Sequence, residues 1–465
     1  MNYFLVAIFA FIGYVLYKFY IYPLYLLPLR KIPSPSVDSF IFGHYAFLNN
    51  KQGEAFVHLI KLYGGLVRLH AFLNQPQLLI SDQTLVQQVI VTHSYEFPSY
   101  FLSETLVKDL VGDENILLAQ GDVHKRQRKM MNPLFTFANV KGMLPIFVQA
   151  GHHLKDIWIK QIGNKKEERI TITDLIPKIT LDIIGLAGFN YEFNSTTSDS
   201  ELSQAYHSLV DQKVSPLYVI LVDFFPFLRK IQTSSTNQYW DSIKTVNNIS
   251  EKIITEQKNA TIRGNNFLSL IVNANEKLPV DEQLTHSELH SQVMQLLIGG
   301  HQTTSTALTW VLYYLAKNPD VQDRLRKEIL EVFIDCNHCP TFDEIDQLKY
   351  LECVFKEGTP LMIPIYAIHH DTSIWGDDTE DFNPSRWLDP EIKSKVTSSN
   401  FLAFSAGPRS CLGMKMAHLE FKTLLPIIIR NFEFRLVEGF IFEKTSFAFT
   451  KPVPGMELFV SKVDY

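Results

Sequence analysis

Phe404-Ser405-Ala406-Gly407-Pro408-Arg409-Ser410-Cys411-Leu412-Gly413 is the stretch that decides how this chain folds. It stands directly before a long apolar pattern with helical periodicity. Gly407 and Gly413 permit turns and close backbone approaches that a side chain would forbid. Cys411 then lies at a helix N-terminus, where backbone N–H groups and the helix dipole favour its thiolate form. The stretch predicts a loop that presents one sulfur to a metal; the alternative is a structural cysteine buried in a glycine-containing loop.

Five of these residues have the spacing F-x-x-G-x-R-x-C-x-G, which resembles the haem-binding signature of the cytochrome P-450 family of haem-thiolate monooxygenases. The resemblance implies haem b (iron protoporphyrin IX) as cofactor, with Cys411 as the axial ligand of its iron. A thiolate on haem iron donates electron density and favours O–O cleavage. Phe404, Gly407 and Arg409 are the other haem-binding residues of the motif, and the forked guanidinium of Arg409 can pair with a haem propionate.

The composition limits the class of protein. A chain of 465 residues with 46% hydrophobic residues, among them 34 Phe and 19 Tyr, can bury a large aromatic-rich core. A net charge of −6 gives no reason to expect a nucleic-acid partner. Four cysteines in a chain of this length do not make a disulfide framework, which suits a reducing compartment.

Residues 1–30 are predicted to form one retained transmembrane helix. The chain is apolar from Tyr3 to Tyr17 and again from Phe19 to Leu29, and about twenty residues are needed to span a bilayer. A cleaved signal peptide would show a basic start and a small-x-small site, and neither is present. Arg30 and Lys31 follow the segment, which places the rest of the chain in the cytosol. With the family resemblance, this implies a single-pass anchor in the endoplasmic reticulum membrane.

A hinge over residues 31–45, containing Pro33-Ser34-Pro35, joins this anchor to a haem-thiolate catalytic domain over residues 46–465. Residues 54–63 are predicted to form a helix, and residues 66–81 two short strands that turn at Asn74-Gln75-Pro76. Helical patterns then dominate to about Phe333. The fold class is therefore mainly α with a smaller β-sheet region, as in the cytochrome P-450 fold.

A basic helix begins near Gly121-Asp122 and contains His124 and Arg128. Charge runs of this kind usually form a solvated positive face. The functional interpretation puts His124 and Arg128 on one face, four residues apart, where both meet a haem propionate. This resembles the family's W-x-x-x-R element, with His124 in place of the usual Trp.

Residues 287–316 are predicted to form a helix that contains Gly299-Gly300-His301-Gln302-Thr303-Thr304. Each glycine costs about 1 kcal/mol in a helix interior relative to Ala, so helix propensity does not explain the pair. Threonine hydroxyls can bond back to helical carbonyls. The stretch resembles the family's A/G-G-x-D/E-T-T oxygen-activation element, which implies catalytic roles for Thr303 and Gln302. Gln302 replaces the usual acid and cannot titrate; the alternative is a core helix with incidental threonines.

The resemblance is interrupted after Glu357. Lys356-Glu357 resembles the start of the family's E-x-x-R helix, but the position of the Arg is occupied by Pro360. A strand is predicted from Leu361, and Asn383-Pro384-Ser385-Arg386-Trp387 again resembles a family element. Several tens of family residues are therefore expected to be absent at 357–358, including one member of a Glu-Arg-Arg cluster. Removing one member of a buried ion cluster typically costs about 3–5 kcal/mol.

The resemblance implies a monooxygenase that inserts one atom of dioxygen into a small apolar organic substrate. Electrons would come from NADPH through a separate reductase, with cytochrome b5 as a further electron-transfer partner, because the chain shows no nucleotide-binding glycine fingerprint. One alternative is an inactive truncated relative that binds haem poorly. Another is a haem-thiolate isomerase or dehydratase that needs no reductase.

Overall fold

The structure is a computed structural model that describes residues 2–44, 53–97, 104–197, 200–210, 218, 221–222, 225–231, 233–259, 264, 266–357, 365–445 and 450–463. The chain forms two compact units. The first unit contains Met1–Phe97, Leu361–Asp381 and Asp389–Ser410, and the second contains Pro98–Pro360, Phe382–Leu388 and Cys411–Tyr465.

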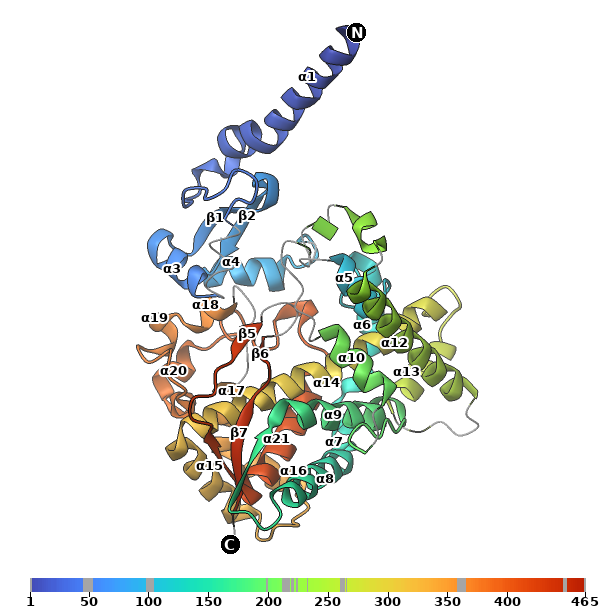
Figure 1. Cartoon of the computed structure of the whole chain (residues 1–465), viewed down its shortest axis with the longest axis vertical. Coiled ribbons are helices and arrows are strands. Elements are labelled where there is room, and N and C mark those ends of the chain that lie inside the picture. Colours follow the sequence, from blue (N-terminus) through green and yellow to red (C-terminus); the bar gives the residue numbers. More distant parts are fainter. Residues whose placement is uncertain are drawn as a thin grey trace. The chain divides into compact units, whose positions relative to one another are not determined.

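The first unit combines short helices with one hairpin (Figure 1). Its elements are α1 (Asn2–Leu16), η1 (Tyr17–Leu26), η2 (Pro28–Lys31), α3 (Glu54–Tyr63), β1 (Leu66–His70), η3 (Phe72–Asn74), β2 (Pro76–Ile80), α4 (Gln83–Gln87), η4 (Gln88–Thr92), α18 (Ile365–His369), α19 (Thr372–Trp375), α20 (Pro390–Lys395) and η9 (Gly407–Arg409).

The hairpin of β1 and β2 confirms the two predicted strands. Leu66 pairs with Ile80 and His70 with Pro76 in an antiparallel register. Val67 and Leu69 alternate along β1 and are buried in a core cluster that includes residues of α3. The helix predicted over residues 54–63 is α3 itself.

The N-terminal segment is a continuous helical rod, α1 followed by the π-helical η1. Tyr3–Leu26 is long and apolar enough to cross a membrane. The ring of Tyr20 stacks on Phe40 with centroids 3.7 Å apart, which joins the end of the rod to the segment that follows it.

The second unit is mainly helical and carries two small sheets (Figure 1). Its elements are α5 (Glu104–Val111), α6 (Gly121–Met131), η5 (Asn132–Phe135), α7 (Phe137–Lys141), α8 (Leu144–Ile162), β3 (Glu167–Thr171), α9 (Ile172–Ile184), η6 (Gly185–Phe189), α10 (Glu201–Val210), η7 (Pro226–Lys230), α12 (Ser234–Asn259), α13 (Phe267–Glu276), α14 (His286–Lys317), α15 (Pro319–Val332), α16 (Phe342–Gln347), α17 (Lys349–Glu357), η8 (Pro384–Leu388), α21 (Met414–Asn431), β4 (Phe432–Leu436), β5 (Glu443–Thr445), β6 (Lys451–Val453) and β7 (Glu457–Lys462).

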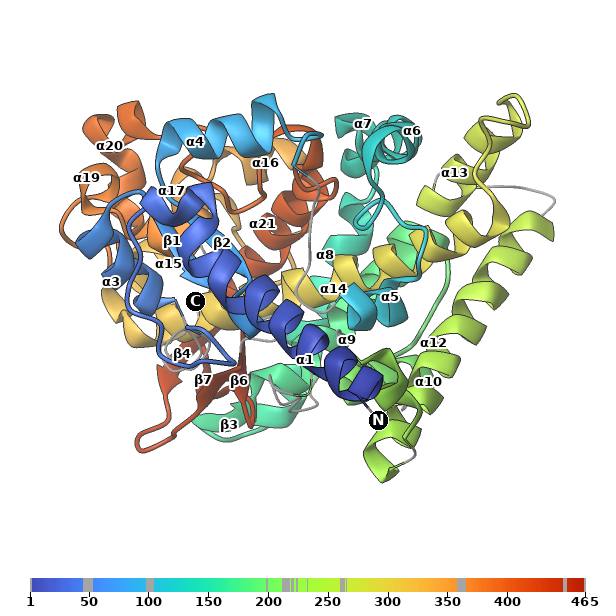
Figure 2. The ribbon, with the colours of Figure 1, turned by 90° about the horizontal axis from the view of Figure 1, so that it is seen from above.

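Helix α14 is the long central element of this unit, with α9 packed along it (Figure 2). It begins with a capping box, in which Thr285 and Glu288 bond each other's backbone N–H groups. Its other neighbours include α5, α12, α15, α21, β4 and η6. The predicted helix over residues 287–316 is confirmed.

The larger sheet has the strand order β3-β7-β4, antiparallel throughout. Trp158 of α8 packs its ring edge-on against Phe432 and Phe434 of β4, with centroids 5.5 Å and 5.8 Å away. The mainly α fold with a smaller sheet region is thereby confirmed.

One element differs from expectation. The strand predicted from Leu361 lies partly outside the described residues, which resume at Ile365, and Ile365–His369 is helix α18. The buried Ala367 and Ile368 of this turn contact α3 and neighbouring core residues, and this packing overrides the β-propensity of the apolar run.

Candidate functional site

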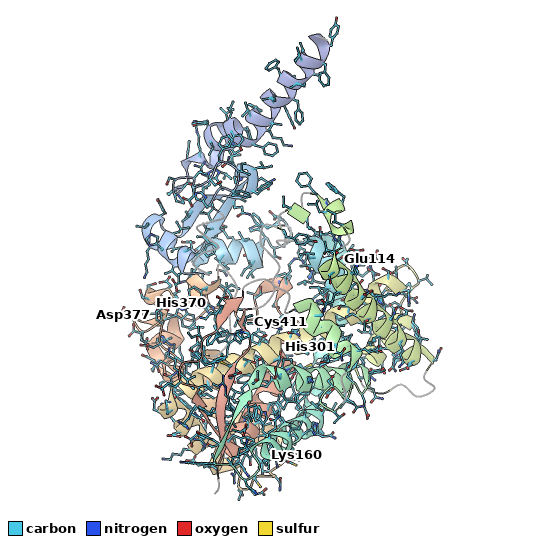
Figure 3. All side chains as sticks on the ribbon, viewed as in Figure 1. Glu114, Lys160, His301, His370, Asp377 and Cys411 are labelled. Carbon is cyan, nitrogen blue, oxygen red and sulfur yellow. The ribbon has the colours of Figure 1, made fainter. Side chains whose placement is uncertain are left out.

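Cys411 stands three residues before α21 in the second unit (Figure 3). The backbone N–H groups of Gly413 and Met414 donate hydrogen bonds to its sulfur. Cys411 is an exposed residue, as are Cys336 and Cys339, whereas Cys353 is buried. The structure therefore presents this sulfur at a helix N-terminus, in the arrangement that favours a metal-ligating thiolate.

The electrostatics of Cys411 reflect opposing influences. Surrounding protein atoms raise the pKa of the thiol by desolvation, while the two N–H donors and the charge of Arg128 act to lower it. On balance the pKa of the Cys411 thiol is raised. A cation that binds the sulfur directly would favour the thiolate far more strongly than these groups do.

Helix α6 carries the two predicted propionate residues. His124 is 2% exposed, and Arg128 is half-buried on the same face. Lys125 is exposed and pairs with Asp122 at 2.8 Å. The helix therefore has the solvated charges that a charge run usually forms, and it also has His124 and Arg128 on a less exposed face. Arg128 lies close enough to Cys411 for its charge to act on the thiol.

Thr303 and Gly299 form an open face on α14. Thr303 Oγ1 donates to the carbonyl oxygen of Gly299 at 2.7 Å, which is the predicted back-bond within the helix. Both residues are exposed, and no described atom lies within 4 Å of where a Cβ on Gly299 would stand. A small molecule can therefore approach this turn of the helix.

Gly300 is a glycine for a different reason. A Cβ there would lie 2.6 Å from Cδ1 and Cγ1 of Ile184 on α9. The sequence could not supply this reason, because it depends on a helix more than a hundred residues away. Gln302 is buried at 3% exposure and points away from the open face that Thr303 shares with Gly299.

The predicted haem motif is divided between the units. Phe404, Gly407 and Arg409 belong to the first unit, whereas Cys411 belongs to the second, with Thr303, Gln302, His124 and Arg128. Gly407 has φ +66°, and a Cβ there would lie 2.3 Å from the carbonyl oxygen of Ile90, so only glycine fits.

Gly413 differs from expectation, because its φ is −84° and the nearest atom to a Cβ would be 3.9 Å away on Phe135. What Gly413 contributes is its N–H group, which any residue except proline has. Arg409 is half-buried with its guanidinium 6.0 Å from the ring centroid of Tyr95. Burial lowers the pKa of Arg409, and the neighbouring Tyr95 acts in the opposite direction.

Sequence reasoning did not find the surroundings of Glu288. This carboxylate, 4% exposed on α14, accepts hydrogen bonds from Thr285 N, from Arg126 and from Gln127. The capping-box spacing of Thr285 and Glu288 was a local signal for part of this cluster. The hydrogen bonds that Arg126 and Gln127 of α6 donate to Glu288 have no signal in the neighbouring sequence.

Comparison with known proteins places these features in a family. The Cytochrome P450 family model matches residues 33–358 and 353–456. Cytochrome P450 monooxygenase 128 of Postia placenta is 29% identical over 476 residues, covering 88% of this chain and 86% of that protein. Cytochrome P450 monooxygenase sphH of Aspergillus fumigatus is 28% identical over 483 residues, covering 91% of this chain and 86% of that protein. Cytochrome P450 monooxygenase claP of Ampulloclitocybe clavipes is 26% identical over 459 residues, covering 86% of this chain and 85% of that protein. The chain belongs to the cytochrome P450 family.

Proposed function

We propose that this chain is a haem-thiolate monooxygenase that inserts one atom of dioxygen into a small apolar organic substrate. The observation that carries the proposal is Cys411, an exposed residue at the start of α21 with two N–H donors on its sulfur. Relatives of this chain are named monooxygenases, which supports the same reaction class.

The residues fit a haem. A cysteine sulfur with N–H donors and a nearby guanidinium suits an iron ligand, and the open turn at Gly299 and Thr303 leaves room beside α14. Cys411 would ligate the iron, and His124, Arg128 and Arg409 would hold the propionates, with Phe404 and Gly407 in the binding loop. The bound haem would supply the chemistry that activates dioxygen.

Thr303 and Gln302 would serve the oxygen side of the site. Thr303 donates its hydroxyl hydrogen to the Gly299 carbonyl oxygen, so the two lone pairs of Oγ1 can accept hydrogen bonds. Gln302 cannot exchange a proton at physiological pH, so protons would come from water. Electrons would come from NADPH through a reductase, with cytochrome b5 as a further electron-transfer partner.

Tyr3–Leu26 would anchor the enzyme in the endoplasmic reticulum membrane with the catalytic domain in the cytosol. Asn194, Asn248 and Asn259 each begin an N-x-S/T sequon. Expression in a eukaryotic host followed by deglycosylation should leave the mobility of the protein on a gel unchanged. A mobility shift would reverse the orientation.

A second candidate is a truncated relative that holds haem poorly, and a specific observation favours it. The family match falls into two pieces that meet at residues 353–358. The alignment with the first relative named above runs over 476 positions but takes in 88% of 465 residues, so several tens of positions have no counterpart here. Arg386, 6% exposed on η8 beside α17, would then belong to an incomplete charge cluster. The Glu357 side chain lies outside the described residues.

The carbon monoxide difference spectrum of the reduced, full-length protein separates the two candidates. A thiolate-type Soret band that is lost in Cys411→Ala supports the monooxygenase. Protein that remains colourless when produced with ample haem supports the truncated relative. Pigment that Cys411→Ala leaves unchanged would refute the assignment of the ligand.

A further inference from the structure

Cys336 and Cys339 are two exposed residues in the loop between α15 and α16, and the proposed oxygenase site uses neither of them. They have the spacing C-x-x-C, in the stretch Cys336-Asn337-His338-Cys339. This spacing is typical of zinc sites and of cysteine pairs that form a disulfide reversibly. A structural zinc site needs four ligands, and among the residues that the structure describes no group of three or more His, Cys, Asp or Glu is placed to hold a metal ion. The loop therefore fits a redox pair better than a metal site.

The backbone of this loop brings the two cysteines into one turn. His338 donates its backbone N–H to the carbonyl oxygen of Asp335 at 3.2 Å, which closes a four-residue turn with Cys336 at its second position. The backbone N–H of Asn337 donates to the side chain of Asp335 at 2.7 Å, as in an Asx turn. The sulfur of Cys339 lies 3.6 Å from the carbonyl oxygen of Asn337, so it points back over the turn. This arrangement suits the closure of a short disulfide ring.

Lys155 of α8 fixes the Cys336 end of the turn. Lys155 is 4% exposed, and its Nζ donates to the carbonyl oxygen of Cys336 at 3.2 Å and to Oδ1 of Asn337 at 2.5 Å. The same ammonium group lies 3.5 Å from Oδ1 of Asp156. A buried ammonium group that loses its acceptors is unfavourable, so these bonds hold the turn against the helix.

His152, nearly one turn earlier on α8, fixes the Cys339 end. Its Nε2 lies 3.1 Å from the carbonyl oxygen of His338, and because a carbonyl oxygen only accepts, this nitrogen carries the hydrogen. The same nitrogen lies 3.9 Å from Sγ of Cys339. The other side of the loop is held by α16, where Oε1 of Glu344 lies 3.2 Å from Nε2 of His338. Both ends of the C-x-x-C stretch are therefore tied to helices before any bond joins the sulfurs.

We propose that Cys336 and Cys339 form a reversible intramolecular disulfide by exchange with a small-molecule disulfide such as oxidised glutathione. The contacts from α8 favour this bond by holding the turn in place. One protein thiolate attacks a sulfur of the small disulfide and releases one small thiolate. The second protein thiolate attacks the mixed disulfide, which joins the two cysteines and releases the other small thiolate. The protein loses two protons and two electrons, and the small disulfide becomes two thiols. This inference goes beyond the proposed oxygenase function and does not depend on it.

The folded chain should form this bond more readily than the unfolded chain. Closing a ring in a flexible chain costs conformational entropy, and the contacts with α8 remove part of that freedom in advance. The equilibrium constant for disulfide formation should therefore be higher in the folded protein. In the cytosol proposed for this domain the pair would rest as two thiols, and it would oxidise when the glutathione pool becomes oxidised.

The first test identifies the oxidised product. The full-length protein in detergent is equilibrated in buffers of graded reduced and oxidised glutathione, and free thiols are then blocked with N-ethylmaleimide. Trypsin cleavage after Lys327 and Lys349 releases residues 328–349, which contain both cysteines of the loop and neither Cys353 nor Cys411. Mass spectrometry separates the doubly blocked peptide, the internal disulfide and the glutathione adduct. The internal disulfide should be the main oxidised form. Oxidation that gives only glutathione adducts or links between molecules would overturn the proposal.

The second test measures the contribution of α8 with Lys155→Met and Asn337→Ala, each of which removes a bond between the helix and the turn. Both should lower the equilibrium constant for disulfide formation several-fold, and unfolding the wild type in urea should lower it at least as far. Lys160→Met, which removes an exposed charge from the same helix, is the control and should match the wild type. Asn337→Ala changes only an exposed side chain, so it decides the question if Lys155→Met does not fold. A constant that neither variant lowers, or that is no higher in the folded than in the unfolded chain, would overturn the proposal.

Discussion

Arg128 on α6 lies close enough to Cys411 for its charge to act on the thiol, lowering a pKa that burial raises. The N–H groups of Gly413 and Met414 act in the same direction as Arg128. Two elements that are distant in sequence, α6 and the start of α21, therefore share control of one sulfur. The effect of Arg128 on the thiol can be measured on protein purified without haem.

Arg128→Gln should slow the alkylation of Cys411. Removing the positive charge raises the thiol pKa further, so a smaller fraction is thiolate near pH 8 and the reaction with a maleimide slows several-fold. The measurement uses a background in which the exposed Cys336 and Cys339 are replaced by Ser. Lys129→Gln, which removes an exposed charge from the same helix, is the control. If both variants slowed alkylation equally, the total positive charge of α6, and not Arg128 in particular, would be what lowers the pKa of Cys411.

The two glycines of α14 should respond oppositely to alanine. Gly299→Ala places its methyl in open space and should stabilise the helix by about 0.5–1 kcal/mol. Gly300→Ala drives its methyl into Ile184 and should destabilise the protein by about 1–3 kcal/mol. Urea unfolding measures both changes. Ile184→Ala should relieve part of the loss in Gly300→Ala, and an additive double variant would contradict the assigned contact.

Glu288→Gln should destabilise the second unit by about 3–5 kcal/mol at pH 7, because the carboxylate is a buried partner of Arg126. Burial opposes ionisation of Glu288, but hydrogen bonds from Thr285, Arg126 and Gln127 outweigh it, and the net pKa is lowered. Its contribution is therefore full above the unfolded pKa near 4.5 and disappears as pH falls through the lower folded pKa. The free energies of unfolding of the wild type and of Glu288→Gln should differ at pH 7, and this difference should be smaller near pH 3. Asp122→Asn, at an exposed surface pair, should behave like the wild type.

The difference in stability between the wild type and Glu420→Gln should depend on pH in the opposite direction to that for Glu288→Gln. Glu420 of α21 is 1% exposed, and burial raises the pKa of its carboxyl well above the usual value. The wild type should then lose about 1.4 kcal/mol of stability per pH unit, relative to the variant, as pH rises from 4.5 towards the folded pKa. Parallel stability–pH curves for the two proteins would show that the carboxyl ionises normally.

Inserting an intact family segment between Glu357 and Gly358 should raise the haem content of purified protein several-fold. The segment would return the Arg of the E-x-x-R motif to the cluster with Arg386. A glycine-serine insertion of the same length is the matched control and should have no such effect. Equal haem content in both insertions would show that the interruption is not what limits haem binding.

Much of the local structure could be predicted from the sequence, because it depends on local signals. Helix α3 and the β1–β2 hairpin follow from periodicity and from the turn at Asn74-Gln75-Pro76. The reasons for Gly300 and Glu288 could not be predicted, since they depend on Ile184 and Arg126 on other helices. The hydrogen bond between the side chains of His301 and Gln302 could not be predicted either, because adjacent residues on a helix normally point in different directions.

The exposure of Cys336 and Cys339 affects how the protein must be handled. Both residues face solvent. Without reductant, such groups can crosslink neighbouring molecules through air oxidation, and a size measurement would then report chemical damage as assembly. Nonreducing electrophoresis of freshly purified samples should precede any statement about stoichiometry.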